Sequence, residues 1–472
     1  MNDKATERSV AIAGGGLAGL AAACALADSG LRVTLFERRP YLGGRASSYE
    51  HPGTGEVLDN CQHVLFRVCT NLIEFYRRIR VEDKIRWYED MTFVEPGGRS
   101  TIMHASALPA PLHTAPSFLR FPFLQGKDKI AISRAIAALT LGAQLESGRS
   151  FLDWCHDHHQ TESAIQLFWK PILVSALSEE LDLISVPYAA QVVRESMKTP
   201  AARHMGVPAI PLTDLYNQAG DYIRARGGNI HFRSSLKTFC PADSEVRICV
   251  SDKDSGGDEG HTFDLLILAL PFNALDSVLP QIPAAEPLRE KLRHFESCPI
   301  TGIHLWFDRQ ITDLDHAVLL DRTIQWMFHK SRLLITRDAT APTGSYVELV
   351  VSASKTLVDK SRAEIVDLAL REVREFFPAA RDATLVKSAV IKEVHATYSP
   401  RPGIDAYRPP QATVWPRVFL AGDWTATGWP ATMEGAVRSG YLVAEALLRA
   451  CGTRKKILVP DLPASGFMRL FS

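Results

Sequence analysis

The 472-residue sequence predicts an α/β protein of at least two domains, with a parallel sheet assembled from segments that lie far apart in the chain. A chain of this length exceeds what one hydrophobic core usually serves. Residues 9–37 contain a β-rich run, a glycine turn, a helical stretch rich in Ala and Leu, and a second β-rich run, which together predict a βαβ unit. Buried-strand patterns return at 263–270 and 414–421, so later segments are expected to complete the same sheet.

The segments between these strands predict a second domain. Residues 67–211 carry mainly helical periodicity, whereas 291–410 contain aromatic-rich strand patterns around one helix predicted at 362–376. We therefore predict a discontinuous first domain and a mixed α+β second domain. The predicted boundaries are 1–66, 212–290 and 411–452 for the first domain, 67–211 and 291–410 for the second, and 453–472 for a C-terminal tail.

The composition argues against several classes of protein. Lys plus Arg and Asp plus Glu number 53 each, so no overall field favours nucleic acid as a partner. The eight cysteines are scattered without a Cys-x-x-Cys pair, and we expect free thiols in a reducing compartment and no metal site. We find no secretion signal in the polar N-terminus and no apolar run of the roughly 18 residues that a membrane span needs, so we expect a cytoplasmic protein.

The first glycine turn has the spacing of a dinucleotide-binding fingerprint of the Rossmann type. Gly14, Gly16 and Gly19, with Ala18 between the last two, give Gly-x-Gly-x-x-Gly between a predicted strand and a predicted helix. The pattern allows a tight turn, a close approach to a pyrophosphate at the helix N-terminus, and close helix packing. Glu37 ends the second strand, where a carboxylate accepts hydrogen bonds from the adenosine ribose.

Further motifs favour FAD over a nicotinamide nucleotide. Arg38 follows Glu37, and a second glycine pair with an arginine, Gly43-Gly44-Arg45, lies close enough in sequence to flank the same pyrophosphate. Near the C-terminus, a predicted strand runs into Gly422-Asp423, and the helix expected at 433–448 begins after Thr432. The sequence therefore predicts non-covalently bound FAD.

Together these motifs resemble the flavin amine oxidase and phytoene desaturase superfamily. The resemblance implies an amine oxidase-like fold, with Asp423 at the ribityl-phosphate region and the backbone of Met433 beside the isoalloxazine carbonyl. Two departures make amine oxidation less expected: Asp59 is followed by Asn-Cys-Gln-His instead of a glycine motif, and Thr432 stands where amine oxidases usually have an aromatic residue.

Within the superfamily the chain resembles the hydroxysqualene dehydroxylase branch, also described as squalene-associated FAD-dependent desaturases. The stretches that carry this resemblance are 58–63, 108–113, 168–171, 305–308, 325–328 and 423–432. It implies reductive dehydroxylation of hydroxysqualene to squalene in hopanoid biosynthesis, with hydride passing from reduced flavin to an allylic cation. Two alternatives stay open, a carotenoid or phytoene desaturase and a prenyl-binding carrier that has lost its flavin.

The resemblance also suggests site residues beyond the cofactor motifs. Asp59 and His63 are candidates for the acid that assists loss of water. The alternative is that Asp59 caps a helix or holds a loop and that His63 is a hydrogen-bonded core histidine. Aromatic residues are candidates for lining a C30 tunnel, with an ordinary core role as the alternative. These aromatic candidates are Trp169, Trp306, Trp326, Phe328 and Trp429.

A polyisoprenoid substrate is nearly insoluble in water, so we expect collection at a membrane surface, on the inner face of the membrane. The apolar loop at 108–124 offers one contact, and the tail, which combines Arg454, Lys455 and Lys456 with apolar residues, offers another. The alternative is that both segments pack on the protein. Because we find no second Gly-x-Gly-x-x-Gly, we expect electrons from NADPH acting transiently at the flavin or from a partner reductase.

Overall fold

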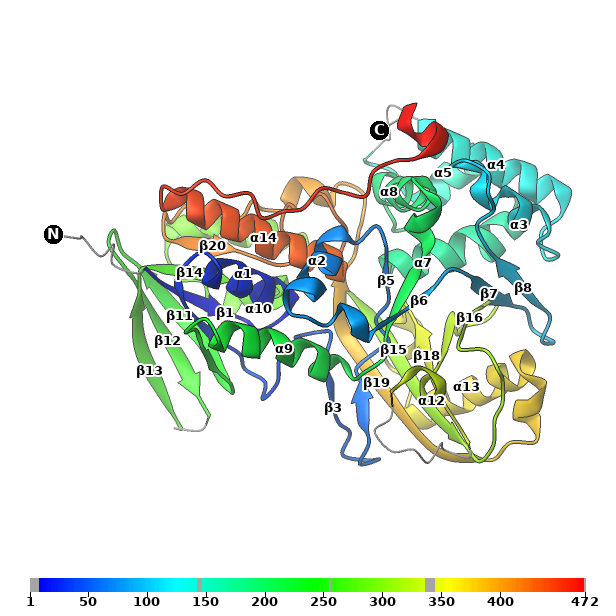
Figure 1. The fold of residues 1–472 in the computed structure, drawn as a ribbon, viewed down its shortest axis with the longest axis horizontal. Helices are drawn as coiled ribbons and strands as arrows, with labels where there is room; N and C mark the ends of the chain where they lie inside the picture. The colour runs from blue at the N-terminus through cyan, green and yellow to red at the C-terminus, as the bar shows by residue number, and fades with distance from the viewer. Residues whose placement is uncertain (1–7, 142–146, 254–255, 336–343, 471–472) are drawn as a thin grey trace.

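The computed structural model describes residues 8–141, 147–253, 256–335 and 344–470. Figure 1 shows two units side by side, one built around the N-terminal strand and the orange-red helix α14, the other containing a large sheet with helices above and below it. Segments far apart in the sequence meet in each unit, as the discontinuous pattern predicts. The cores of both units are formed by buried aliphatic and aromatic side chains.

The first unit contains a five-stranded parallel sheet. Its order is β10-β2-β1-β14-β20, with all neighbours parallel. The strands are β10 (Asn229–His231), β2 (Arg32–Phe36), β1 (Ser9–Ala13), β14 (Leu265–Leu268) and β20 (Val418–Leu420). Strands β1, β14 and β20 are buried along their whole length, because the sheet is covered on both faces.

Helices cover one face of this sheet and an antiparallel meander covers the other. The helices are α1 (Leu17–Ala27), α2 (Thr70–Arg78), α9 (Leu212–Arg224) and α14 (Met433–Ala450), and the meander is β11 (Ser234–Pro241), β12 (Val246–Asp252) and β13 (Gly257–Phe263). Helix α2 lies within 67–211, which we assigned to the second domain, yet its apolar face packs in the core of the first unit. The Glu434 carboxylate reinforces this placement, because it accepts hydrogen bonds from the amides of Asn71 and Leu72.

Helices α1 and α14 cross at very short range. Every residue of α1 is buried. At Gly440 of α14, an added Cβ would lie 2.4 Å from the carbonyl oxygen of Ala18 and 2.8 Å from the Cβ of Ala21. Only a residue without a side chain allows this approach, which holds the C-terminal helix against the N-terminal βαβ unit.

The second unit is organised around a seven-stranded mixed sheet of order β19-β15-β18-β17-β16-β7-β8. Its strands are β7 (Met91–Val94), β8 (Ser100–Met103), β15 (Ser297–Phe307), β16 (His316–Leu319), β17 (Trp326–His329), β18 (Ser345–Val351) and β19 (Leu385–Tyr398). Helix α13 (Arg362–Phe376) has the predicted bounds and packs on one face. The short helix α12 (Lys330–Leu333) follows β17.

Helices and two small sheets complete the structure. The helices are α3 (Ala115–Leu119), α4 (Gly126–Leu141), α5 (Phe151–Asp157), α6 (Glu162–Ala164), α7 (Lys170–Leu177), α8 (Val186–Met197), α10 (Phe272–Leu275) and α11 (Glu286–Leu292). The small sheets are β3 (Ser48–Glu50) with β4 (Val57–Asp59), and β5 (Leu65–Phe66) with β9 (Met205–Pro208) and β6 (Ile85–Tyr88). None of the described helices is both long and apolar enough to cross a membrane.

The α1–α14 crossing gives a stability prediction. Gly440→Val should lower the free energy of unfolding by about 2–3 kcal/mol, because the added carbons meet backbone that cannot move without separating the helices. Urea unfolding of the purified protein measures the change. Gly260→Val, in strand β13 where a Cβ meets nothing within 4 Å, is the matched control and should stay within about 0.5 kcal/mol of the parent. Equal losses in the two variants would contradict this account.

Candidate functional site

One cavity of about 1080 Å³ extends between the two units, and the predicted motifs meet along it. Its polar end is formed by the first glycine turn, the second glycine pair and the start of α14. The predicted cofactor residues that line it are Gly14, Gly16, Ala18, Glu37, Arg38, Gly43, Gly44, Arg45, Gly422, Asp423, Thr432 and Met433. Gly19 lies behind this surface, where an added Cβ would meet the carbonyl oxygen of Gly14 at 2.0 Å, so its role is the close packing expected of it.

The glycine turn forms a cradle that side chains would fill. Gly14 has φ +112°, and an added Cβ would lie 2.4 Å from the carbonyl oxygen of Ala269. A Cβ on Gly44 would lie 2.8 Å from the Cα of Gly16, so the two glycine motifs touch. Gly16 is the N-cap of α1 without a side-chain hydrogen bond to the helix, which leaves the first-turn amides for a pyrophosphate.

Two carboxylates are held at fixed positions along the cradle. Glu37 Oε2 accepts a hydrogen bond from the Gly15 amide at 2.7 Å, and Oε1 accepts one from the Arg39 amide at 2.8 Å. Each oxygen keeps a lone pair for a ribose hydroxyl. Asp423, 378 residues from Arg45, accepts a hydrogen bond from Arg45 Nη2 at 2.6 Å. This ion pair joins the N-terminal and C-terminal motifs.

The start of α14 completes the polar end. Thr432 is its N-cap, and its hydroxyl accepts a hydrogen bond from the Gly435 amide at 3.0 Å. This cap leaves the amide of Met433 on the cavity side of the helix, whose N-terminal dipole stabilises negative charge. A cradle that excludes Cβ atoms, two anchored carboxylates and a helix N-terminus at each end fit a dinucleotide with a flavin ring.

The remainder of the cavity is mostly apolar. The rings of Trp326 and Phe328 stack at 5.5 Å with an interplanar angle of 6°, and both line the cavity. Trp429 lines it as well. Other apolar residues of this part are Met91, Phe93, Met103, Phe118, Ile136, Phe168, Val318 and Val350. Three of the five predicted aromatic residues therefore line the cavity.

The other two aromatic candidates, Trp169 and Trp306, lie outside the cavity wall. Trp169 is 1 % exposed, and its indole N–H donates to Gln160 Oε1 at 2.9 Å within a cluster of aromatic rings. Trp306 stacks on Tyr346 at 4.3 Å, on the part of the sheet covered by the β3–β4 hairpin. Their placement corresponds to the core role that the sequence left open. In the sequence, the helical pattern of 163–177 and the alternation of β15 show which residues are apolar. They do not show which face of the helix or strand lies next to a cavity.

His63 lines the cavity, between its polar and apolar parts. Its Nδ1 lies 2.7 Å from the carbonyl oxygen of Cys61, so this nitrogen carries the proton and donates, which leaves Nε2 as an acceptor. Burial lowers the pKa of His63 below its ordinary value and is the largest effect on it. His63 is therefore a neutral acceptor, whereas the sequence suggested an acid.

Asp59 is 4 % exposed and does not line the cavity. Its Oδ2 accepts a hydrogen bond from Lys330 Nζ at 2.6 Å, and its Oδ1 accepts from Ser48 Oγ at 2.6 Å and from the Leu212 amide at 3.2 Å. Burial raises the pKa of Asp59, but the Lys330 charge and these hydrogen bonds outweigh it, so the pKa lies below its ordinary value. Asp59 is thus placed as an ionised partner of Lys330, not as the expected proton donor.

The sequence motifs did not identify Lys330 and Glu348 as candidate site residues. Both are fully buried, and Lys330 Nζ lies 3.4 Å from Glu348 Oε2. Lysine and glutamate are ordinary surface residues, and neither belongs to a recognised motif. The only available signal was their position in strand patterns made otherwise of apolar residues.

The cavity opens toward a rim of exposed apolar side chains. Leu112 and Phe467 line the opening and are 47 % and 52 % exposed, and the Phe467 amide donates to the carbonyl oxygen of Ala110 at 2.8 Å. Leu108 and Leu119 in the same segment as Leu112, and Leu470 in the same turn as Phe467, are also exposed. The segment at 108–124, predicted as a loop, contains α3 and meets the C-terminal turn at Ala110. The exposed residues Leu108, Leu112, Leu119, Phe467 and Leu470 are here called the apolar rim.

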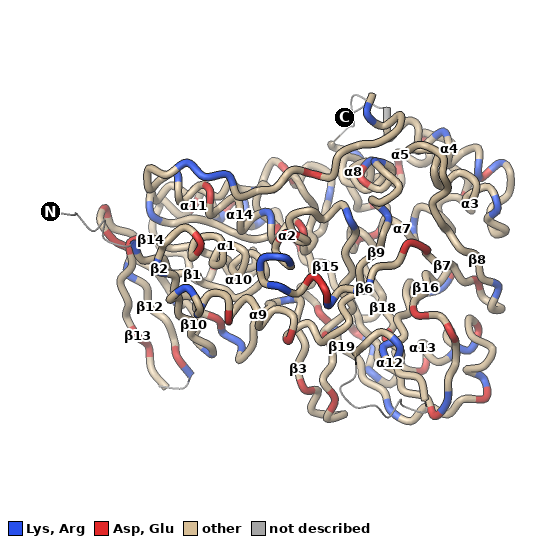
Figure 2. The backbone as a smooth tube through the Cα atoms, in the orientation of Figure 1, with Lys and Arg blue, Asp and Glu red and all other residues tan. Residues whose placement is uncertain are grey.

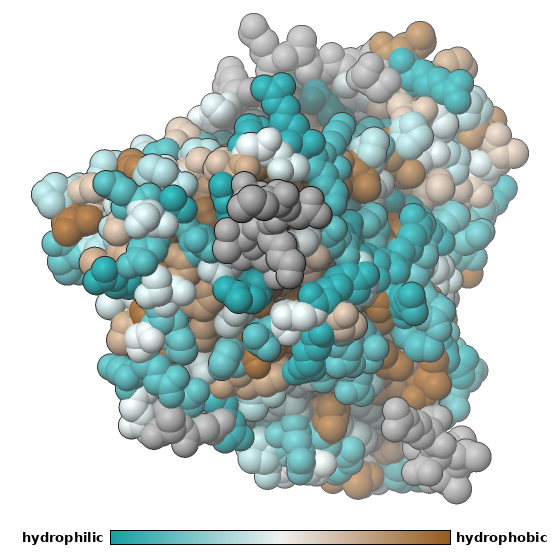
Figure 3. Space-filling model, turned by 60° about the vertical axis from the view of Figure 1, so that its left-hand side comes forward, coloured by the Kyte–Doolittle hydropathy of each residue, from teal (hydrophilic) through white to brown (hydrophobic). Residues whose placement is uncertain are grey.

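The basic part of the tail lies elsewhere. Lys455 Nζ donates to Ser29 Oγ at 3.0 Å, close to the end of α1, and Ile457 is buried in the core of the first unit. Figure 2 shows this basic run on the segment that passes beside α14. Figure 3, with the side of the first unit turned forward, shows mainly hydrophilic residues with small apolar groups between them. The basic and apolar parts of the tail therefore do not form one surface.

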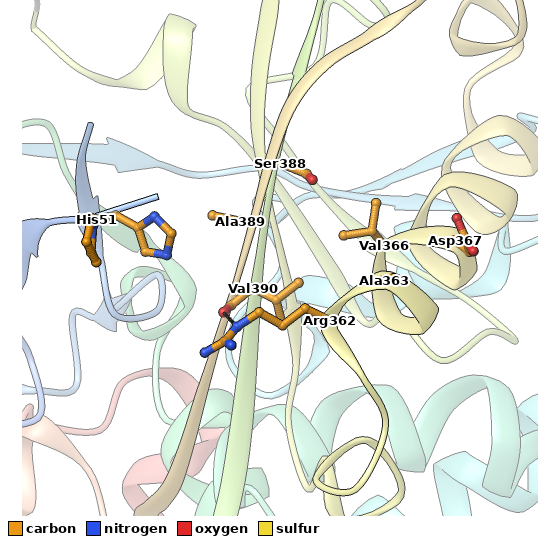
Figure 4. A pocket seen from close by; sticks show the side chains of 9 residues that line it. His51, Arg362, Ala363, Val366, Asp367, Ser388, Ala389 and Val390 are labelled. Atoms are coloured by element: carbon orange, nitrogen blue, oxygen red, sulfur yellow. Dashed lines mark hydrogen bonds between the residues drawn. The ribbon is translucent and has the colours of Figure 1, made fainter. Parts of the chain in front are cut away.

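A second hollow of about 530 Å³ lies between His51, the start of α13 and strand β19 (Figure 4). Arg362 reaches across it and donates to the carbonyl oxygen of Val390 at 3.3 Å. It contains none of the motif residues, so the chemistry is expected in the larger cavity.

Comparison with known proteins agrees with this geometry. The family model described as flavin containing amine oxidoreductase matches residues 17–448, so the chain belongs to that family, and FAD is its cofactor. The 15-cis-phytoene desaturase of Synechococcus elongatus is 27 % identical over 454 residues, which cover 93 % of this chain and 95 % of that protein. The zeta-carotene desaturase of Synechocystis is 27 % identical over 475 residues, covering 93 % and 97 %.

Solved structures show the same fold. A putrescine oxidase variant aligns with a TM-score of 0.72 at 17 % identity, covering 94 % of this chain and 99 % of that one. Cyclohexylamine oxidase from Brevibacterium oxydans aligns with a TM-score of 0.66 at 17 % identity, covering 95 % and 100 %. The predicted amine oxidase-like architecture is thereby confirmed.

The Arg45–Asp423 pair gives a prediction for cofactor affinity. Arg45→Gln should weaken FAD binding by about 10- to 100-fold, because it removes a charged hydrogen-bond donor from the cradle and leaves Asp423 without its cation. Flavin fluorescence on titration of the apoprotein measures the dissociation constant. Arg99→Gln removes an exposed arginine paired with Glu95 and should leave that constant unchanged. If Arg45→Gln binds FAD with the dissociation constant of the parent, the Arg45–Asp423 pair does not contribute to cofactor binding.

Proposed function

We propose that this member of the flavin containing amine oxidoreductase family exchanges hydride between FAD and a long polyisoprenoid hydrocarbon. The observation that carries the proposal is the single cavity, in which a dinucleotide cradle continues into a long aromatic and aliphatic arm. FAD, when bound, supplies a two-electron donor or acceptor. The chain's own residues bind the substrate through apolar contacts, exclude water and offer one neutral imidazole beside the flavin end.

Desaturation is the direction that the relatives favour. The similar proteins named above are phytoene and zeta-carotene desaturases. In this reaction hydride leaves one carbon for FAD, a proton leaves its neighbour, and a double bond forms. The neutral imidazole of His63 suits the proton-accepting role, because its Nε2 is free to accept and the protonated form is disfavoured by burial.

Reductive dehydroxylation of hydroxysqualene to squalene is a second candidate. The polar wall at Asn60, Gln62 and His63 supports it, because a polyene offers no hydrogen-bond partner for these groups, whereas an allylic hydroxyl can donate to His63 Nε2. Here the hydroxyl oxygen takes up a proton from solvent and leaves as water, and hydride passes from the reduced flavin to the substrate carbon, so the flavin must be reduced again. NADPH or a reductase would supply those electrons, and desaturation would require an electron acceptor instead. A flavin-free carrier is the less supported alternative, given the intact cradle.

The two directions give opposite changes in the flavin. Oxidised FAD-loaded protein mixed anaerobically with phytoene in vesicles should bleach near 450 nm in step with a more unsaturated product, if desaturation is correct. Photoreduced protein mixed with hydroxysqualene should regain that absorbance as squalene forms, if dehydroxylation is correct. Absorbance and mass analysis of extracted lipid measure both.

Control incubations distinguish desaturation from dehydroxylation. Each substrate is also offered to protein in the opposite flavin state, where no change is expected. Reaction with phytoene alone selects desaturation, and reaction with hydroxysqualene alone selects dehydroxylation. Flavin changes with neither substrate would overturn the proposed polyisoprenoid class while leaving the FAD site intact.

We further propose that the apolar rim docks on an anionic membrane surface, from which the substrate enters. Leu112 and Phe467 of the rim line the cavity, and the exposed cations Arg120 and Lys127 follow the rim residue Leu119 in the chain, which suits anionic lipid headgroups. Loop and tail contribute together, but the basic run at 454–456 is not part of this surface.

Membrane docking is tested with charges placed on the rim. Leu119→Glu with Leu470→Glu should lower co-sedimentation with phosphatidylglycerol-containing vesicles at least about 10-fold, because two exposed leucines lose apolar burial. Val386→Glu, at an equally exposed apolar position on β19, should bind vesicles like the parent. If all three proteins sediment alike, the rim is not the docking surface.

A further inference from the structure

Three charged side chains meet behind the cavity wall. Lys330 Nζ lies 2.6 Å from Asp59 Oδ2 and 3.4 Å from Glu348 Oε2, and the three side chains are 2 %, 3 % and 0 % exposed. Asp59 ends β4, Lys330 begins α12 directly after β17, and Glu348 lies in the middle of β18. A buried lysine with two carboxylates is uncommon, because each charge removed from water requires a partner.

The group is connected to the wall itself. Lys330 Nζ also donates to Gln62 Oε1 at 2.8 Å, and Gln62 Nε2 donates to the carbonyl oxygen of His63 at 3.1 Å. Both Gln62 and His63 line the cavity. Asn60, one residue after Asp59, donates through its amide to the carbonyl oxygen of Arg45 in the cofactor cradle. The ammonium group thus holds the segment that joins the cradle to the apolar arm.

The charges of this group do not balance if all three are ionised. Asp59 is fixed as a carboxylate by its hydrogen bonds, and the Lys330 ammonium is held by the carboxylates despite its burial, which keeps its pKa raised. Neither oxygen of Glu348 makes a well-aligned hydrogen bond to a described residue. Burial, opposed by Lys330, raises the pKa of Glu348 to about 7. Of the three side chains, Glu348 is therefore the one whose charge can change near pH 7.

The remaining titratable groups around Glu348 are neutral near pH 7. Burial lowers the pKa of His304 on β15 to about 3, so this imidazole is uncharged, and its Nδ1 pairs with Tyr346 OH at 2.9 Å. Burial also raises the pKa of Tyr346 on β18 and of the Cys61 thiol. No described neighbour other than Asp59 and Lys330 therefore competes with Glu348 for charge in this range.

We propose that Asp59, Lys330 and Glu348 form a positioning cluster for the cavity wall, in which a proton on Glu348 keeps the cluster neutral and leaves Lys330 bound to Asp59 and Gln62. When that proton is released to solvent, the Glu348 carboxylate competes for the ammonium group. The hydrogen bond from Lys330 to Gln62 then weakens, and the wall beside the cradle is held less firmly in place. Glu348 is a positioning residue here, because it acts through Lys330 and Gln62.

The sign of the stability effect follows from proton binding. Because folded Glu348 binds its proton more tightly than the unfolded chain does, its contribution to stability is complete below pH 4.5 and is lost as the pH rises through about 7. Glu348→Gln keeps the shape and removes the titration. The melting temperature of the parent should therefore fall relative to that of Glu348→Gln between about pH 5 and pH 8.

Two measurements on FAD-loaded and FAD-free protein test the proposal without relying on activity. Infrared titration of the FAD-free protein should show the carbonyl band of a buried protonated carboxyl that disappears as the pH rises through about 7, and Glu348→Gln should lack this band. The FAD dissociation constant should rise several-fold over the same range in the parent and stay constant in Glu348→Gln.

Glu179→Gln is the matched control. Glu179 is also fully buried beside a lysine, with Lys355 Nζ at 2.6 Å, but its side-chain partners are Lys355 and Ser399, not residues of the segment at 59–63. It should lose stability yet keep the parent's infrared band and pH profile of FAD binding. The proposal is overturned if the band persists in Glu348→Gln or if parent and variant have parallel melting profiles. Should Glu348→Gln fail to fold, the parent's infrared titration decides, because absence of a carboxyl titrating near pH 7 overturns the proposal.

Discussion

Helix α1 meets α14 at a point where Gly440 has no side chain, and this contact brings the two halves of the cofactor cradle together. The glycine turn before α1 comes from the first strand of the chain, and the Gly422–Asp423 turn and the Thr432 cap come from residues more than 400 positions later. A side chain at Gly440 would separate the helices and, with them, Arg45 from Asp423. The cradle therefore depends on tight helix packing as much as on its own residues.

The cavity combines two environments that would ordinarily require separate sites. Amides, glycines and anchored carboxylates at one end suit a charged dinucleotide, whereas stacked aromatic rings at the other suit a hydrocarbon. The segment at residues 60–63 forms the boundary between them. Solved amine oxidases share the overall fold. The substrate is therefore decided by side chains on a common fold, not by the fold itself.

The ionic groups at the cradle and behind the cavity wall differ in their exposure to water. In the cradle, the partly exposed Arg45 pairs with the buried Asp423, so one member of this ion pair keeps contact with solvent. Behind the wall, Asp59, Lys330 and Glu348 are removed from water, so any change in their protonation must be absorbed by neighbouring contacts. Because the ionic group lies behind the wall, not on it, the apolar arm is free of these charges, while Lys330 still donates a hydrogen bond to Gln62.

The amino-acid sequence alone was enough to identify the discontinuous parallel sheet, the helix at 362–376, the FAD motifs and the superfamily, because these depend on local periodicity and on short motifs whose spacing reflects one backbone geometry. It did not show that α2 packs in the first unit, that Trp169 and Trp306 lie outside the cavity, or that Asp59 faces Lys330. Those outcomes depend on which face of a helix or strand meets which neighbour, and the neighbours lie up to several hundred residues away. Burial sets the protonation of His63 and Glu348 for the same reason, since it exists only once the chain has folded around them.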